Sequence, residues 1–191
     1  MYPSEVFFAT GNKHKFDEVK PIASKYGFVL KQYPGVKFEV QSDDLRVIAR
    51  TAAIQAYGEV GKPILVEDAG LFVEALNGFP GPYSSFVYKT IGVEGLLKLM
   101  KDIADRRACF KSVAVLIYEP YFVVKEGEVC GHIAHEARGD KGFGFDPVFI
   151  PDGSDKTFAE MSIEEKNLFS HRAKAVEGVF SFLREHGLRT E

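Results

Sequence analysis

Several features that would place this chain in a specialised class of protein are missing from its sequence. It has two cysteines, Cys109 and Cys130, which lie in apolar strand-like runs without the spacing of metal ligands. We expect buried free thiols there, with a disulfide as the minor alternative. No apolar run approaches the ~18 residues needed to span a bilayer, and the N-terminus has no signal-peptide pattern. Repeats and long linkers are also absent, so we expect a single cytoplasmic domain, 1–191, without a membrane partner.

The charge of the chain is nearly balanced. It has 24 Lys and Arg against 27 Asp and Glu, which gives a formal net charge of -3. Proteins that bind nucleic acid are usually basic, so we expect no nucleic-acid partner, although a local basic cluster can still hold phosphate. A hydrophobic share of 46% and a charged share of 27% are ordinary for a soluble globular protein.

Apolar patterns predict strands and helices that alternate along the chain. Strands are expected at Glu5–Ala9, Phe28–Tyr33, Ile64–Val66, Leu71–Leu76, Ala108–Tyr118, Phe122–Ala137 and Val148–Ile150. Helices are expected at Lys13–Tyr26, from Ser42 to about Val60, at Gly95–Met100, after Ser162 and after Ser170. Pro21 predicts a kink or a break in the first helix, and Glu119-Pro120 predicts a hairpin turn. This mixture predicts an α/β fold with a mixed sheet.

The turn Thr10–Lys15 combines small residues with lysines directly after the apolar run Val6–Ala9. A strand that leads through such a turn into a helix directs backbone N–H groups and the positive end of the helix dipole at one point. Thr10 and Asn12 add polar side chains. We interpret the turn as a phosphate site, and the alternative is a tight turn whose lysines are solvated. It does not have Walker A spacing.

Two adjacent carboxylates, Glu67 and Asp68, follow the apolar run Ile64–Val66. Such a pair at the end of a strand is costly unless positive charges or a metal compensate it. Mg²⁺ commonly takes one or two carboxylates together with phosphate and water oxygens. Glu39, just before a predicted helix, is a third candidate ligand. The alternatives are a solvated turn, or an Asp68 that braces nearby backbone.

Glycines and aromatic residues alternate in the run Gly139–Pro147. Their spacing is not that of a dinucleotide fingerprint, but a phenylalanine beside glycine can offer a flat face to a base. Asp146 could accept hydrogen bonds from such a base. The alternative is a loop that returns to the next strand, and we expect one of Phe143 and Phe145 to lie in the core.

Basic residues recur in the run Glu164–Arg172. Lys166 and Arg172 can both contact a polyanion, Arg172 through two parallel hydrogen bonds. His171 can bond a base or a phosphate. The common alternative for such a run is a solvated, charged helix face.

Taken in this order, these runs resemble the inosine-triphosphate pyrophosphatase family over nearly the whole chain. The matching motifs are Thr10-Gly11-Asn12-x-x-Lys15 with Glu18, Val66-Glu67-Asp68-x-Gly70-Leu71, Gly78-Phe79-Pro80-Gly81-x-Tyr83-Ser84, Gly142–Pro147, Thr157–Met161, Glu164–Asn167 and Ser170–Arg172. Each motif alone is weak, but seven in register are specific.

The resemblance implies a reaction and a fold. Members of that family cleave purine nucleoside triphosphates between the α and β phosphates, which releases the monophosphate and pyrophosphate. Their preferred substrates are the triphosphates of inosine, deoxyinosine and xanthosine, and the reaction cleanses the nucleotide pool. The implied fold is an elongated, two-lobed α/β structure with a central mixed β-sheet, flanking helices and a nucleotide cleft between the lobes. A homodimer is also implied.

The resemblance also implies residue roles. Asp68 would accept a proton from the attacking water and, with Glu39, bind Mg²⁺. The residues implied to bind substrate are Thr10, Gly11, Asn12, Lys13, His14 and Lys15 at the phosphates, and Phe143, Gly144, Phe145, Asp146, Lys166, His171 and Arg172 around the base and adjacent phosphate.

Ala69 departs from the family pattern, which has serine at this position. The backbone N–H of Ala69 can still contact substrate, so we expect activity to survive. Two other functions remain open at this point. One is a related pyrophosphatase that acts on pyrimidine or modified nucleotides, and the other is a nucleotide sensor that no longer hydrolyses.

Overall fold

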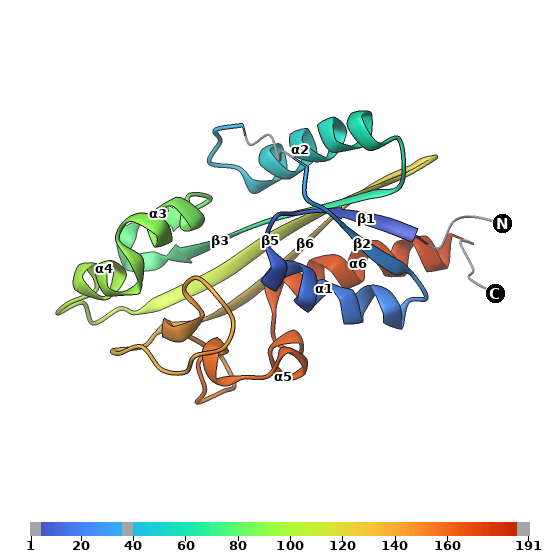
Figure 1. Ribbon diagram of the computed structural model, residues 1–191. Helices are drawn as coiled ribbons and strands as arrows, with labels where there is room; N and C mark the ends of the chain where they lie inside the picture. The colour runs from blue at the N-terminus through green and yellow to red at the C-terminus, as the bar shows by residue number, and fades with distance from the viewer. Residues whose placement is uncertain (1–4, 36–39, 187–191) are drawn as a thin grey trace. The chain divides into compact units, whose positions relative to one another are not determined.

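A computed structural model describes residues 5–35 and 40–186 of the chain (Figure 1). Its strands are β1 (Glu5–Ala9), β2 (Val29–Tyr33), β3 (Ile64–Val73), β4 (Pro80–Gly81), β5 (Arg107–Tyr118), β6 (Tyr121–Ile133) and β7 (Phe149–Pro151). Its α-helices are α1 (Lys13–Lys25), α2 (Leu45–Val60), α3 (Ser84–Thr90), α4 (Gly92–Leu99), α5 (Ile163–Asn167) and α6 (His171–Glu185). Short 3-10 helices lie at Glu74–Leu76, Asp146–Val148 and Phe158–Glu160. Among the described residues, no helix is both long and apolar enough to cross a membrane.

The strands form a mixed sheet in the order β2-β1-β3-β5-β6-β7, with β4 beside β3. β1 runs parallel to β2 and β3, whereas β4 is antiparallel to β3 and β7 is antiparallel to β6. The predicted α/β class with a mixed sheet and flanking helices is therefore confirmed. The nucleotide cleft between lobes stays a prediction.

Two compact units divide the chain. Unit 1 comprises Met1–Asp68, Ser112–Gly127 and Arg172–Glu191, and unit 2 comprises Ala69–Lys111 and Glu128–His171. β3, β5 and β6 each pass from one unit into the other, so the units share strands. The single catalytic domain 1–191 stays a prediction.

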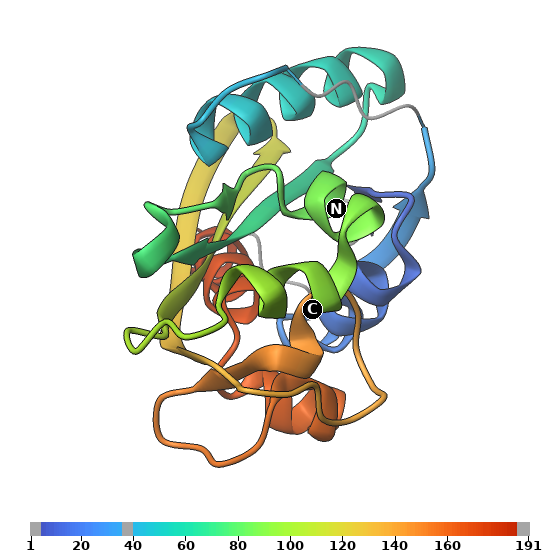
Figure 2. The same ribbon diagram turned by 90° about the vertical axis from the view of Figure 1, so that its left-hand side faces the viewer.

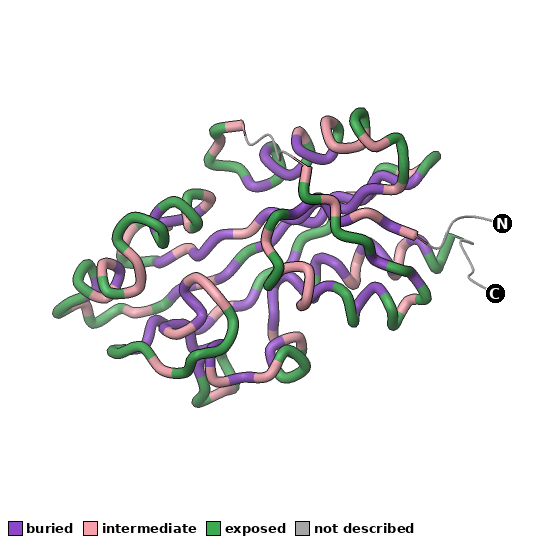
Figure 3. Tube along the Cα trace, in the orientation of Figure 1, coloured by how far each residue is buried: buried purple, intermediate pink, exposed green. Residues whose placement is uncertain are grey.

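The core of unit 1 forms where helices α1 and α6 pack on the parallel strands. Val6 and Phe8 alternate along β1 and are fully buried. The helices contribute apolar residues at helical spacing, namely Val19, Ile22 and Ala23 from α1 and Ala173, Val176, Phe180 and Leu183 from α6. Figure 1 shows both helices on one side of the strands and α2 on the other. Burial follows the strands, and the outer helix faces are exposed (Figure 3).

Helix α1 continues through Pro21, so the chain does not break there as one alternative predicted, and the kink stays a prediction. Proline removes one backbone hydrogen bond within a helix. Pro21 lies on the exposed face of α1, where water can satisfy the carbonyl that loses its partner. The side-chain packing of the opposite face then keeps the helix intact.

The sequence predicted that a strand ends at Glu67 and Asp68, but β3 continues past both residues. It runs for 10 residues from Ile64 to Val73, so both carboxylates lie in its middle. Gly70 allows β4 to pair closely with this part of β3, because a Cβ at Gly70 would lie 2.2 Å from the carbonyl oxygen of Gly81 in β4. The two adjacent acids do not end the strand, because positive charges in the protein compensate Glu67, as described below.

The cysteines correct a second expectation. Cys109 and Cys130 are half-buried and form a disulfide with a Cα–Cα distance of 4.0 Å, so the predicted free thiols are wrong. The predicted hairpin already indicated this pairing of the two cysteines. Counting equally outward from the turn at Glu119-Pro120 sets Cys109 opposite Cys130, and Figure 2 shows the two long strands side by side. The sequence favoured free thiols because disulfides are rare in cytosolic proteins.

We expect Gly70→Ala to lower the free energy of unfolding by about 1–3 kcal/mol or more, since the new methyl group would overlap the backbone of Gly81. Gly58→Ala is the matched control, because Gly58 lies in α2 with nothing within 4 Å of its Cβ position. That control should stabilise the protein by about 0.5–1 kcal/mol. Chemical denaturation measures both, and equal stabilities of the two variants would contradict the close approach of β3 and β4.

Candidate active site

The turn after β1 is organised by Asn12. Its side-chain oxygen caps α1 by accepting hydrogen bonds from the backbone N–H groups of His14 (2.9 Å) and Lys15 (3.3 Å). Thr10 Oγ1 accepts from the N–H of Asn12 at 3.1 Å. Several N–H groups that we expected to be open to a ligand are therefore engaged within the turn. Gly11 is exposed, and a Cβ there would meet nothing within 4 Å, which leaves room for an anion against the backbone.

Lys15 joins this turn to the acidic strand β3. Its Nζ lies 2.8 Å from Glu67 Oε2 and 3.4 Å from the carbonyl oxygen of Glu67. The parallel pairing of β1 with β3 explains the contact, since Phe7 pairs with Ile64 and Phe8 with Leu65. Their carboxyl ends therefore point the same way, which brings the turn after β1 beside the acidic residues of β3.

Arg172, at the start of α6, lies between two carboxylates. Its Nη1 is 2.5 Å from Glu18 Oε2, and its Nε is 3.2 Å from Glu67 Oε2. Ser112 Oγ in β5 donates to Glu67 Oε1 at 2.6 Å. We call Lys15, Glu18, Glu67, Ser112 and Arg172 the buried charge cluster of unit 1. Burying such charges is tolerated only because each faces an opposite charge or a hydrogen-bond donor.

Burial and the neighbouring charges have opposite effects on the pKa values of Glu67 and Arg172. Burial alone would raise the pKa of Glu67, but the charges of Arg172 and Lys15 and the hydrogen bonds from Lys15 and Ser112 hold that pKa well below its ordinary value. Burial would lower the pKa of Arg172, but Glu67 and Glu18 raise it above its ordinary value. Glu67 is thus a carboxylate, and Arg172 is a cation, over the physiological pH range.

Asp68 follows Glu67 in the strand and is 9% exposed. Successive side chains of a strand point to opposite faces, so Asp68 does not share the environment of Glu67. Carboxylate oxygens are the donors that Mg²⁺ prefers, and one or two of them suffice beside phosphate and water. The chemistry of Asp68 therefore fits a Mg²⁺ ligand. Glu39, the other expected ligand, lies outside the described residues.

In unit 2, Asp146 organises a second group of the expected residues. Asp146 Oδ2 lies 2.6 Å from Lys166 Nζ and accepts a hydrogen bond from the N–H of Phe143 at 2.9 Å. The ammonium group of Lys166 also lies 5.1 Å from the centre of the Phe143 ring. We call Phe143, Asp146 and Lys166 the Asp146 cluster. Gly142 is required here, because its φ is +70° and a Cβ would lie 2.1 Å from Asp146 Oδ2.

The two phenylalanines of this loop divide as expected. Phe145 is 2% exposed and belongs to the core of unit 2, whereas Phe143 is half-buried. His171 is buried and stacks on Phe110, with ring centroids 4.7 Å apart. The prediction that one of the two phenylalanines lies in the core is confirmed.

The remaining expected residues lie as follows. Lys13 and His14 are exposed on the first turn of α1, and Lys13 pairs with Asp17. Gly144 has φ +63°, and Ala69 is half-buried in β3. The roles of all the expected site residues in binding and catalysis stay predictions. The partnership of Glu18 and Ser112 with Glu67 and Arg172 was not foreseen, although Glu18 lies one helical turn after Lys15 and so shares its face.

Comparison with known proteins identifies the family of the chain. A sequence model described as the Ham1 family matches residues 6–182. The chain belongs to the Ham1 family. A dITP/XTP pyrophosphatase of Hyperthermus butylicus is 54% identical over 95% of this chain and 96% of its own. One of Ignicoccus hospitalis is 50% identical over 92% of this chain and 94% of its own.

Solved structures extend the likeness to the fold. A HAM1 protein from Coxiella burnetii matches with a TM-score of 0.82 at 30% identity, over 97% of this chain and 100% of that one. The Staphylococcus aureus Ham1 protein matches with a TM-score of 0.81 at 30% identity, over 95% of this chain and 99% of that one. The Ham1 fold is therefore shared with structures of bacterial proteins.

We expect Glu67→Gln to lower the free energy of unfolding by about 3–5 kcal/mol, because Lys15 and Arg172 would lose their shared buried counter-charge. The folded pKa of Glu67 is depressed, so its stabilisation is present above the unfolded pKa of about 4.3 and declines as the pH falls below that value. The variant should therefore lose part of the acid dependence of stability. Denaturation from neutral to acid pH measures both effects.

The matched control is Glu94→Gln, since Glu94 is exposed in α4. It should leave both the stability and its pH dependence close to those of the wild type. An unchanged stability and pH dependence in Glu67→Gln would contradict the assignment of Glu67 to the buried charge cluster.

Proposed function

We propose that this Ham1-family chain hydrolyses the triphosphates of deaminated purine nucleosides to the monophosphate and pyrophosphate. Its relatives of 54% and 50% identity are named dITP/XTP pyrophosphatases. The observation that carries the proposal is the contact of Lys15 with Glu67, which brings the glycine-containing turn to the acidic strand. A turn for phosphate beside a strand that supplies a carboxylate base is what the reaction requires.

In this proposal, the turn Thr10–Lys15 and the N-terminus of helix α1 bind the phosphates. The N-terminus of α1 carries the positive end of the helix dipole, and the exposed backbone at Gly11 lets an anion approach. Lys15 adds a cation that Glu67 holds beside β3. Positioning and charge neutralisation of this kind account for most of the catalysis of phosphoryl transfer.

Asp68 is the proposed general base. A water oxygen forms a bond to the α-phosphorus, the bond from that phosphorus to the bridging oxygen breaks, and pyrophosphate leaves with the bonding electron pair. The water gives its proton to a carboxylate oxygen of Asp68. When bound, Mg²⁺ would neutralise charge on the phosphate oxygens, with Asp68 and Glu39 as its proposed ligands.

We propose that the Asp146 cluster selects the purine base of the substrate. Deaminated purines carry an oxygen at position six, where adenine carries an amino donor. The ammonium of Lys166, which Asp146 holds at 2.6 Å, would donate a hydrogen bond to an oxygen at position six but would face a second donor in the amino group of adenine. We favour Lys166 over Arg172 for this contact, because the Arg172 guanidinium contacts Glu18 and Glu67.

We also propose that the protein is cytoplasmic and that it forms a homodimer. Apolar side chains exposed in unit 2 support the dimer, namely Phe79, Tyr83, Phe86, Tyr88 and Ile91. The mass of the protein in solution, measured by light scattering, tests this part of the proposal.

Asp68→Asn should reduce kcat for dITP by about 10²–10⁴-fold while the fold persists, because the amide has the shape of the acid but cannot accept the proton. Release of pyrophosphate measures the rate, and circular dichroism checks the fold. Asp152→Asn is the control, since Asp152 is exposed, and it should retain wild-type activity. A well-folded Asp68→Asn protein with the wild-type rate would exclude Asp68 as the base.

The value of kcat/KM should be at least about 10²-fold higher for dITP than for dATP, because adenine would set a donor against the buried donor of the site. These two nucleotides share the sugar and the phosphates and differ at position six of the base. Steady-state release of pyrophosphate measures the ratio. Equal values would remove deaminated purines as the selected substrates, and hydrolysis of neither would favour a sensor.

A further inference from the structure

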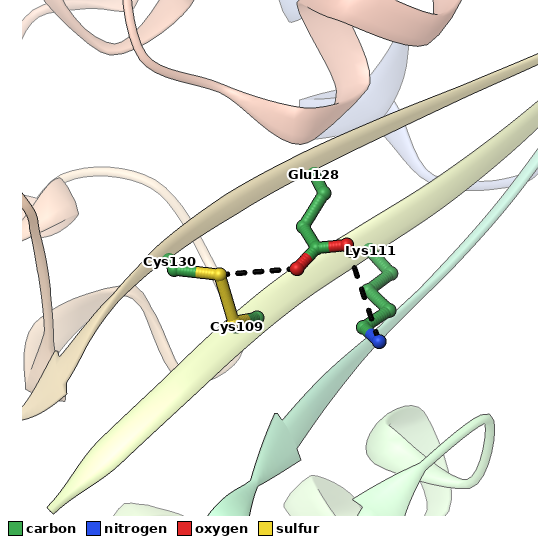
Figure 4. Close-up of a disulfide and its surroundings, with 4 residues drawn as sticks. All are labelled: Cys109, Lys111, Glu128 and Cys130. Atoms are coloured by element: carbon green, nitrogen blue, oxygen red, sulfur yellow. Dashed lines mark hydrogen bonds and ion pairs between the residues drawn. A yellow bond between two sulfur atoms is a disulfide. The ribbon is translucent and has the colours of Figure 1, made fainter.

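A cluster of metal-ligating side chains on β5 and β6 takes no part in the proposed reaction. Cys109 in β5 is bonded to Cys130 in β6, and Glu128 lies two residues before Cys130 on the same face of its strand. Figure 4 shows Glu128 directed at the disulfide, with its Oε1 3.0 Å from Cys130 Sγ. A disulfide sulfur carries no hydrogen, so this is a close approach of a carboxylate to sulfur rather than a hydrogen bond.

These side chains are accessible. The neighbour of Cys109, Phe110, packs in the core of unit 2 against Phe149 and Phe158. Because the faces of a strand alternate, Cys109 points away from that core. Both cysteines are half-buried and Glu128 is exposed, so a solute can reach the sulfurs and the carboxylate.

The spacing of the three ligand atoms suits a metal ion. One sulfur from each cysteine and one oxygen from Glu128 all lie within 4.8 Å of one another, and the described residues contain no other such group of three. Tetrahedral Zn²⁺ has Zn–S distances of ~2.3 Å and Zn–O distances of ~2.0–2.2 Å, which set its ligand atoms ~3.5–3.8 Å apart. Rotation about the Cα–Cβ bonds can separate the sulfurs to this distance once their bond is broken.

We propose that the reduced chain binds one Zn²⁺ through Cys109, Cys130 and Glu128, and that the disulfide excludes the metal. Reduction by a dithiol supplies two electrons and two protons, converts the protein disulfide to two thiols and leaves the reductant as a disulfide. Binding of Zn²⁺ then displaces the two thiol protons and forms two Zn–S bonds. Water completes the coordination at the exposed side.

Charge and ligand type support zinc over magnesium here. Two thiolates and a carboxylate carry three negative charges, of which Zn²⁺ neutralises two. Lys111 Nζ lies 4.0 Å from Glu128 Oε2 and reduces the remaining negative charge (Figure 4). Thiolates select zinc, whereas magnesium prefers oxygen ligands. The site is therefore distinct in its chemistry from the proposed Mg²⁺ site at Asp68.

The test uses the full chain in its oxidised form and after reduction by a phosphine that is removed without oxygen. Zn²⁺ is titrated by competition with a chromophoric chelator, and Co²⁺ is added separately to detect thiolate-to-cobalt charge-transfer absorption. We expect one Zn²⁺ for each reduced chain, none for each oxidised chain, and no displacement by excess Mg²⁺. Glu128→Gln should weaken binding to the reduced chain by about tenfold or more, a loss that even an outer-shell partner commonly causes.

Glu136→Gln is the matched control, because Glu136 is an exposed acid of the same unit, and it should bind Zn²⁺ as the wild type does. Equal uptake by the oxidised and reduced chains, or no uptake by the reduced chain, overturns the proposal. Wild-type affinity in Glu128→Gln overturns the three-ligand site. Should the reduced chain unfold, circular dichroism must show that Zn²⁺ restores its fold, and failure to do so also overturns the proposal.

Discussion

The contact of Arg172 with Glu18 and Glu67 is the interaction on which the rest of unit 1 depends. It joins α1, β3 and α6, and Ser112 adds β5 to the same group. Buried charges of this kind are tolerated only in a complete set, since loss of one member leaves the others uncompensated in a medium of low dielectric constant. The cluster therefore fixes one arrangement of these elements. That arrangement holds Lys15 at Glu67, where the proposed phosphate site needs it.

The adjacent acids of β3 illustrate how one strand can serve two purposes. Glu67 faces Lys15, Arg172 and Ser112, and this environment keeps it ionised and engaged within the protein. Asp68 has the same charge, but as the next residue of the strand it points to the other face. A general base must be able to accept a proton, which Glu67 resists because its pKa is held so low. This difference between Glu67 and Asp68 favours Asp68 as the general base.

Several features of the fold and the site could be predicted from local chemistry. Asn12 before α1, and Ser162 with Glu165 at α5, are capping signals that need only neighbouring residues to act. The hairpin at Glu119-Pro120 was likewise visible. Helix α3 at Ser84–Thr90 was not expected, because no strong apolar period marks so short a segment. The break at Pro21 and the free thiols were wrong, because exposure of Pro21 and the pairing register of Cys109 with Cys130 outweighed the general rules.

The sequence by itself determined the α/β class, the positions of most strands and helices, and the residue types available for phosphate and metal chemistry. These follow from periodicity, capping and ligand preference, which act over a few residues. Only the tertiary structure decided which charges meet. Glu18, Glu67 and Arg172 are far apart in sequence, so no local pattern predicts that they meet. Their pairing depends on strand order and helix packing, because burial removes the water that would otherwise satisfy each charge separately.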